Sequence, residues 1–119
     1  MPESDLSPLE RVMERLETNR SATPEGYAET MRLLARTLAL PVRDYARREE
    51  LARAFIPPGW ECDVLTLAGG FSCFLRKDDE LVRGCGPSAS WAILFAALWA
   101  IDIEEKAGRP WRPVLREAA

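Results

Sequence analysis

The sequence predicts an α+β protein in which N-terminal helices pack with a short antiparallel sheet, itself covered by a buried C-terminal helix. Helical periodicity dominates residues 7–55, and short strand-like segments follow a Pro-Pro-Gly break. The run Trp91–Ile101 is unbroken in its apolar character, too long for an ordinary strand and too short for a bilayer, which needs about 20 apolar residues. We expect a single domain over residues 1–119, comprising a helical half, a ββ(β)α half and an extended tail (7–55, 60–106 and 107–119).

Two start signals define the first helices. Ser7-Pro8-Leu9-Glu10 has the form of a capping box with proline at the first helical position, and Thr23-Pro24-Glu25 begins a second helix in the same way. Pro41 ends that second helix, because the residue before a proline is disfavoured in helical geometry. The charge-rich segment 42–55 predicts a third helix, which Ile56-Pro57-Pro58-Gly59 would break.

Three short strands are predicted after the break, at Trp60–Leu67, Phe71–Arg76 and Glu80–Arg83. Gly69-Gly70 predicts a two-residue hairpin turn, since glycine accepts positive φ. That turn would place Leu65 opposite Phe74 and Asp63 opposite Arg76, two favourable cross-strand pairs. The other face of the hairpin would then carry Trp60, Cys62, Val64, Cys73 and Leu75.

The buried helix is predicted over residues 88–106, with Pro87 before it and Gly108 as its stop signal. Gly84-Cys85-Gly86 would form a tight loop that leads into it. A helix that covers one sheet needs one apolar stripe, whereas this one is apolar around much of its circumference. The first two helices could cover its second side in a monomer, or a homodimer could form across a face made of Trp91, Leu94, Phe95 and Leu98.

Composition excludes several kinds of chemistry. The chain has three cysteines, no histidine and a net charge of −3. Ser-His-Asp and Cys-His pairs are therefore absent, and three cysteines without a CxxC spacing make a poor zinc site. We expect no enzyme activity, no cofactor, no metal and no direct nucleic-acid binding. The start of the sequence lacks a basic and an apolar leader region, so we expect a cytoplasmic location without membrane association.

The second half, residues 42–104, resembles small phage-encoded proteins described as an ABA sandwich. The matching segments are Gly59-Trp60, the hairpin Trp60–Leu75 with Gly69-Gly70-Phe71, and Pro87–Leu98. The resemblance implies a helix, a glycine-bearing hairpin and a final Ala- and Leu-rich helix over the sheet. It also implies a phage or prophage setting, and it carries over no catalytic residue.

Acidic residues are the candidates for binding a partner. They form two sets, one at a predicted turn and one near the predicted C-terminal end of the last helix, where negative charge opposes the helix dipole: Asp78, Asp79 and Glu80, then Asp102, Glu104 and Glu105. A solvated surface is the plain interpretation of both sets. The functional one is a mimic of nucleic-acid phosphates that docks in the basic groove of a host nucleoprotein complex.

We therefore expect a non-enzymatic binding protein of phage type, of which an inhibitor of a host defence complex, similar to an anti-CRISPR protein, is one concrete version. Two alternatives stay open. One is a structural or assembly homo-oligomer. The other is a small enzyme using Cys85, whose position before a predicted helix N-terminus favours a reactive thiol.

Overall fold

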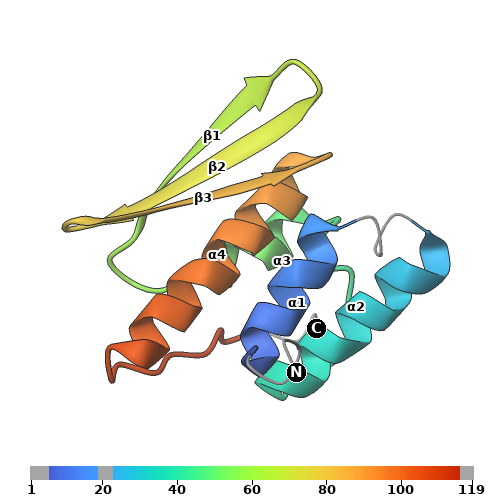
Figure 1. The fold of residues 1–119 in the computed structure, drawn as a ribbon, viewed down its shortest axis with the longest axis horizontal. Coiled ribbons are helices and arrows are strands. Elements are labelled where there is room, and N and C mark those ends of the chain that lie inside the picture. The colour runs from blue at the N-terminus through green and yellow to red at the C-terminus, as the bar shows by residue number, and fades with distance from the viewer. Residues whose placement is uncertain (1–5, 19–22, 116–119) are drawn as a thin grey trace. The chain divides into compact units, whose positions relative to one another are not determined.

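The computed structural model describes residues 6–18 and 23–115, and these form an α+β protein (Figure 1). Within them lie four helices and one three-stranded antiparallel sheet. The chain divides into two compact units, Met1–Asp44 and Tyr45–Ala119. This division falls ahead of the Ile56–Gly59 break at which the helical half was predicted to end.

The first unit contains α1 (Pro8–Glu17) and α2 (Pro24–Leu38), which contact each other. The predicted capping box is confirmed: Ser7 N donates to Glu10 Oε1 at 3.0 Å, and Glu10 N donates to Ser7 Oγ at 3.2 Å. Thr23 Oγ1 likewise accepts from the Gly26 backbone at 3.0 Å. α2 ends at Ala39, whose φ of 56° is left-handed, two residues before Pro41.

The predicted helix over residues 42–55 is wrong, because only α3 (Glu49–Arg53) is helical there. Tertiary contacts hold the segment before α3. Ser90 Oγ donates to the Ala46 carbonyl at 2.9 Å, and the buried Tyr45 ring packs edge-on against Phe55 with centroids 5.1 Å apart. Helix propensity is a weak preference, and buried contacts of this kind outweigh it.

The sheet has the order β1-β2-β3, with β1 at Glu61–Leu67, β2 at Gly70–Lys77 and β3 at Glu80–Gly86 (Figure 1). The predicted register is wrong by two residues: Leu65 lies opposite Ser72 and Asp63 opposite Phe74. The turn is Ala68-Gly69, where Gly69 alone supplies the positive φ, so Gly70 is free to pair with Leu67. An offset of two leaves every side chain on its predicted face, because side chains alternate with period two.

β3 extends through Gly84-Cys85-Gly86, which the sequence analysis assigned to a loop. Gly84 and Gly86 face the last helix at very close range. A Cβ atom on Gly84 would lie 2.6 Å from the Ala96 backbone nitrogen, and one on Gly86 would lie 2.8 Å from Trp91 Cβ. These glycines therefore permit close helix–sheet packing within a strand.

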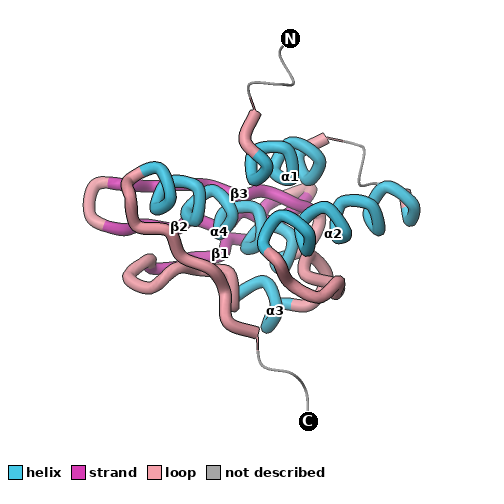
Figure 2. Tube along the Cα trace, turned by 90° about the horizontal axis from the view of Figure 1, so that it is seen from below, coloured by secondary structure: helices cyan, strands magenta, loops and turns pink. Residues whose placement is uncertain are grey.

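The predicted buried helix is confirmed as α4 (Ala89–Lys106), and it lies over the sheet against β2 and β3 (Figure 2). Ser88 is its N-cap and accepts from the Trp91 backbone at 3.2 Å. Both sides of the apolar run are buried, as shown by its fully inaccessible side chains Ile93, Leu94, Leu98 and Ile101. The predicted extended tail contains no helix or strand over residues 107–115, and residues 116–119 lie outside the described part of the chain.

Candidate partner-binding surface

The sheet has one face on α4 and an opposite face, which we call the outer face. The register and the contacts of Gly84 and Gly86 with α4 assign the outer positions. Several of the apolar side chains there are open to solvent, with exposures of 49% for Leu65, 46% for Leu67 and 56% for Leu81. The outer face comprises Glu61, Asp63, Leu65, Leu67, Ser72, Phe74, Arg76, Leu81, Arg83 and Cys85.

A polar cluster orders the centre of the outer face. The Arg83 guanidinium lies 5.7 Å from the Phe74 ring centroid, within the range of a cation–π contact. Its Nη2 also donates to Ser72 Oγ at 3.1 Å. Ser72 is only 1% exposed, so this contact satisfies a buried hydroxyl and fixes the arginine over the middle strand. The exposed leucines therefore surround a rigid centre.

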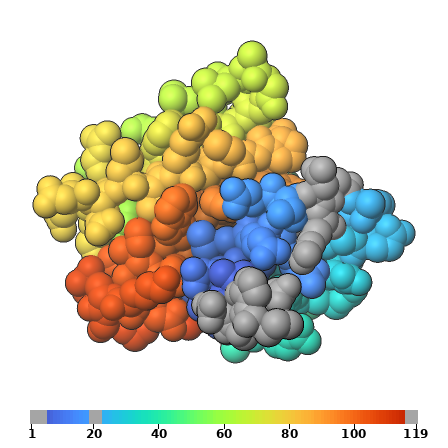
Figure 3. Space-filling view, in the orientation of Figure 1, coloured from blue at the N-terminus to red at the C-terminus, as the bar shows by residue number. Residues whose placement is uncertain are grey.

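The first acidic set consists of the two turn residues between β2 and β3, Asp78 and Asp79, and the first residue of β3, Glu80, and we call these three residues the acidic turn. All three residues are exposed, and the turn (yellow) lies at the surface in Figure 3. Asp78 has a φ of 53°, a left-handed geometry that aspartate tolerates better than most residues. Its charge also raises the pKa of Arg109, as a smaller contribution beside that of Glu104. Among residues 6–18 and 23–115, neither Asp79 nor Glu80 has a side-chain ion pair.

The second acidic set is held in ion pairs within its own unit. Asp102 pairs with Lys106 at 2.9 Å, and Glu105 pairs with Arg112 at 3.4 Å. These cations offset the unfavourable position of the carboxylates near the helix C-terminus. The structure therefore separates the two sets: the acidic turn is exposed, whereas the carboxylates at the end of α4 have cationic partners.

Glu104 shows this internal pairing most clearly. It is 5% exposed, and Lys77 Nζ lies 3.0 Å from its Oε1 while Arg109 Nε lies 2.9 Å from its Oε2. Hydrogen bonds from Arg109 and then from Lys77 lower the pKa of Glu104 to about 2, against an ordinary value of 4.5. The carboxylate thus ties β2 and the tail to the last turn of α4. The i, i+4 spacing of Asp102 and Lys106 could have been found in the sequence, whereas nothing there signalled Lys77 as a partner.

The predicted oligomer face lies on α4 and is largely buried within the chain. Leu94 and Leu98 have no exposed surface, Phe95 is 8% exposed, and Trp91 is half-buried beside Gly86. Trp99 is the accessible aromatic residue of this helix, at 40% exposure. Assembly of copies through α4 stays a prediction, and the exposed Trp99 is where such contacts would begin.

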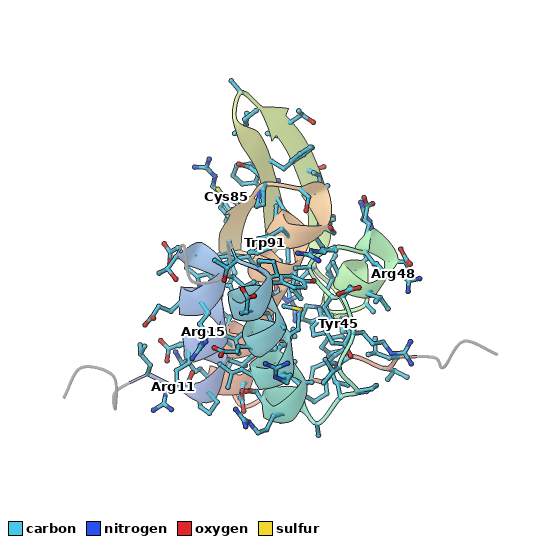
Figure 4. The ribbon with its side chains drawn as sticks, turned by 90° about the vertical axis from the view of Figure 1, so that its right-hand side faces the viewer. Arg11, Arg15, Tyr45, Arg48, Cys85 and Trp91 are labelled. Carbon is cyan, nitrogen blue, oxygen red and sulfur yellow. The ribbon has the colours of Figure 1, made fainter. Side chains whose placement is uncertain are left out.

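Cys85 lies on the outer face and is exposed (Figure 4). Its neighbours Gly84 and Gly86 point to α4, so the thiol points away from that helix, and its Sγ lies 3.6 Å from Ser72 Oγ. The predicted loop around Cys85 is therefore wrong, because the residue lies in β3 and α4 begins only at Ala89. A small enzyme that uses Cys85 stays a prediction.

The outer face was not predicted from the sequence to be a binding surface. Its leucines alternate along the strands with inward residues, but Glu61, Asp63, Arg76 and Arg83 occupy the same face. A face so rich in charge is typical of solvated sheet surfaces. The signal that could have identified it is the number of leucines that share that face. Leu65 and Leu67 are alternate residues of the edge strand β1 and so lie on the same side of the sheet.

Comparison with known proteins finds no matching family model, no matching curated protein and no matching solved structure. The similarity to phage ABA-sandwich proteins therefore stays a prediction. Over residues 6–18 and 23–115, no helix is long and apolar enough to cross a bilayer. The same described residues contain no group of three or more cysteine, aspartate or glutamate side chains placed to hold a metal ion.

Proposed function

We propose that this protein acts without catalysis, by docking on another protein through the outer face and the adjoining acidic turn. The observation that carries this proposal is the combination of exposed leucines with the carboxylates of Asp79 and Glu80, which have no ion pair among the residues that the structure describes. Leu81 follows the acidic turn directly in the chain, so apolar and acidic groups adjoin at one end of the sheet. A surface of this composition fits a partner with a basic rim around an apolar patch.

The partner favoured by this charge is a protein that itself binds nucleic acid. Asp79 and Glu80 would occupy sites that normally receive phosphates, and so compete with nucleic acid for a basic groove. A specific form of the proposal is a phage-type inhibitor of a host defence complex, similar to an anti-CRISPR protein. The support for this form is the exposed acidic turn together with the resemblance of residues 42–104 to phage proteins.

Energetics assign different roles to the two parts of the surface. Covering the exposed halves of Leu65, Leu67 and Leu81 would contribute about 1 kcal/mol each, which does not by itself offset the entropy cost of association. Complementary charge raises the association rate and rejects wrong partners. We therefore expect the leucines to slow dissociation and the acidic turn to select the partner.

The test is affinity capture from host lysate with two charge-matched variants. Asp79→Lys with Glu80→Lys changes the acidic turn, and Glu17→Lys with Glu25→Lys changes two exposed helical positions instead. Each pair raises the net charge from −3 to +1, because two residues each change by +2. The first variant should lose the captured protein, and the second should retain it. Melting temperatures should stay close to the wild-type value in both.

Two further results decide between forms of the proposal. The captured protein should bind nucleic acid, and added duplex DNA should release it from the wild-type chain. Leu81→Ser should speed dissociation with little change in melting temperature. Equal loss of capture in both lysine variants would show that net charge acts without a site. Capture that survives both Leu81→Ser and the acidic-turn variant would overturn the proposed surface.

A further inference from the structure

Cys62 and Cys73 form a close thiol pair on the α4-facing side of the hairpin. Their Sγ atoms lie 3.6 Å apart. Cys62 pairs with Leu75 and Cys73 with Val64, so the two cysteines are diagonal neighbours on adjacent strands. The third cysteine, Cys85, lies on the outer face and takes no part in this contact.

The two thiols differ in their surroundings. Cys62 lies on the edge strand and is half-buried, whereas Cys73 lies on the middle strand and is fully buried. Arg53 Nη1 lies 3.9 Å from Cys62 Sγ, and Glu49 holds that guanidinium through a 2.8 Å contact to its Nε. Cys62 thus combines access to small molecules with a positioned cation beside its sulfur.

Burial raises the pKa of the Cys73 thiol, and the neighbouring Cys62 raises it further through charge and a hydrogen bond. The Cys73 thiol is therefore held in its protonated, weakly nucleophilic form. Conversion of Cys62 to a sulfenic acid removes the contribution of the Cys62 thiol to that shift, while the larger contribution of burial remains. The environment thus favours reaction at Cys62 first and at Cys73 second.

We propose that Cys62 and Cys73 are a redox-active dithiol that hydroperoxides oxidise to an intramolecular disulfide. The Cys62 sulfur attacks one peroxide oxygen, the O–O bond breaks, and hydrogen peroxide yields a Cys62 sulfenic acid and one water. The Cys73 sulfur then attacks the Cys62 sulfur and expels the hydroxyl, which leaves as a second water with the Cys73 proton. The two thiols lose two electrons and two protons, and the peroxide gains them.

Arg53 stabilises the negative charge that develops on the departing peroxide oxygen, because its guanidinium lies beside the attacking sulfur. Closing the bond requires the sulfurs to approach by about 1.5 Å, since a disulfide is about 2.05 Å long. Within the described part of the chain, β1 is an edge strand paired with β2 alone, so it can move toward its neighbour without disturbing a second strand. The resulting bond would fix the strand that carries Leu65 and Leu67.

The experiment treats the folded full chain with hydrogen peroxide and maps its peptides without reduction. We expect a mass loss of about 2 Da, a crosslink between Cys62 and Cys73, and reversal by dithiothreitol. In Cys85→Ser the same crosslink should form, because Cys85 lies on the other face. In Cys73→Ser the first step should proceed alone, leaving a Cys62 sulfenic acid that dimedone traps.

Arg53→Gln and Arg48→Gln give a matched pair for the role of the cation. Both arginines belong to α3 or its cap and contact an acidic residue two or four positions away, but only Arg53 contacts Cys62. Arg48 lies at α3 in Figure 4. Loss of Arg53 should slow disulfide formation about fivefold, and loss of Arg48 should leave the rate unchanged.

The proposal stands apart from the docking function and can fail independently of it. It would be overturned if peroxide modified Cys85 while Cys62 and Cys73 stayed reduced in the folded chain. It would also be overturned if the Cys62–Cys73 crosslink formed only after urea unfolding. Both results come from the unmutated chain, so they hold even if a cysteine variant fails to fold.

Discussion

The two faces of the sheet use the same three strands in opposite ways. The face on α4 carries Cys73, Leu75 and Val82 at 0–2% exposure, and two glycines where the helix comes closest. The outer face carries leucines at about half exposure among charged residues. For the two hairpin strands, the alternation in the sequence placed the residues on the same faces as the observed register does. The difference shows that burial here is set by where α4 lies, since leucines occur on both sides of the sheet.

Side-chain size is the second difference. On the outer face the β3 positions hold Leu81, Arg83 and Cys85, whereas the positions between them hold Val82, Gly84 and Gly86. The side chains on the α4 face of β3 therefore become smaller toward the N-terminal end of α4. This lets α4 approach the strand so closely that backbone and side-chain atoms of Ala92, Ala96 and Trp91 fill the space of the missing side chains.

Gly84→Val should have the largest effect on stability. Strand propensity alone predicts that Gly84→Val raises the free energy of unfolding, because valine is more favourable than glycine in a strand. The contact with α4 predicts the opposite, since a Cβ atom would lie 2.6 Å from the Ala96 nitrogen. We expect a loss of about 4 kcal/mol in the free energy of unfolding, measured by urea denaturation. Cys85→Val on the outer face should change it by less than about 0.5 kcal/mol. Similar values for both variants would contradict the close packing of α4 on β3.

These glycines also mark the limit of prediction from sequence. The capped helices and the buried helix followed from local signals, namely Ser7, Thr23, Pro87 and an apolar run, and the Ser88 cap became visible only in the structure. Gly84 and Gly86 were predicted to lie in a loop, because glycine weakens a strand unless another element packs closely against it. Here that element is α4, and its contact with β3 is known only from the structure.

The third predicted helix is wrong for a related reason, and the contacts of the second acidic set were not predictable from local sequence. Residues 42–48 have a helix-like charge pattern, yet the Ala46 carbonyl is used by Ser90, which is distant in sequence. The acidic residues near the end of α4 were identified as binding candidates without knowledge of Lys77 and Arg109. The Ser90–Ala46 and Lys77–Glu104 contacts join residues 44 and 27 positions apart, which local sequence patterns do not reveal, whereas Arg109 lies five positions from Glu104.

Leu75→Ala and Leu81→Ala make the same substitution on opposite faces of the sheet. Leu75 is fully buried on the middle strand, and Leu81 is 56% exposed on β3. Removing Leu75 should lower the free energy of unfolding by about 3 kcal/mol, through lost burial and the cavity left behind. Removing Leu81 should cost less than about 1 kcal/mol. Urea titrations of both variants measure this difference in the free energy of unfolding. A loss for Leu81→Ala close to that for Leu75→Ala would mean that the Leu81 side chain is packed.

Glu104→Gln tests the charged contact on the α4 side of the sheet. Lys77 follows Leu75 by two residues and so shares its face, where the Glu104 carboxylate meets it at 3.0 Å. Glutamine cannot replace charge-assisted bonds to both Lys77 and Arg109, so we expect a loss of about 2 kcal/mol at neutral pH. The exposed pair of Glu105 with Arg112 supplies the control, and Glu105→Gln should cost less than about 0.5 kcal/mol.

The pH dependence of that loss separates an ion pair from a packing defect. The pKa of Glu104 is lowered to about 2 in the folded chain from an ordinary value of 4.5. A lowered pKa means that the stabilisation is complete above pH 4.5 and disappears as the pH falls through about 2. The difference in unfolding free energy between the wild type and Glu104→Gln should therefore be constant from neutral pH down to the ordinary pKa, then shrink toward zero. A difference that stays constant in acid would show that the glutamine disturbs packing, and that the carboxylate charge does not hold β2 and the tail on α4.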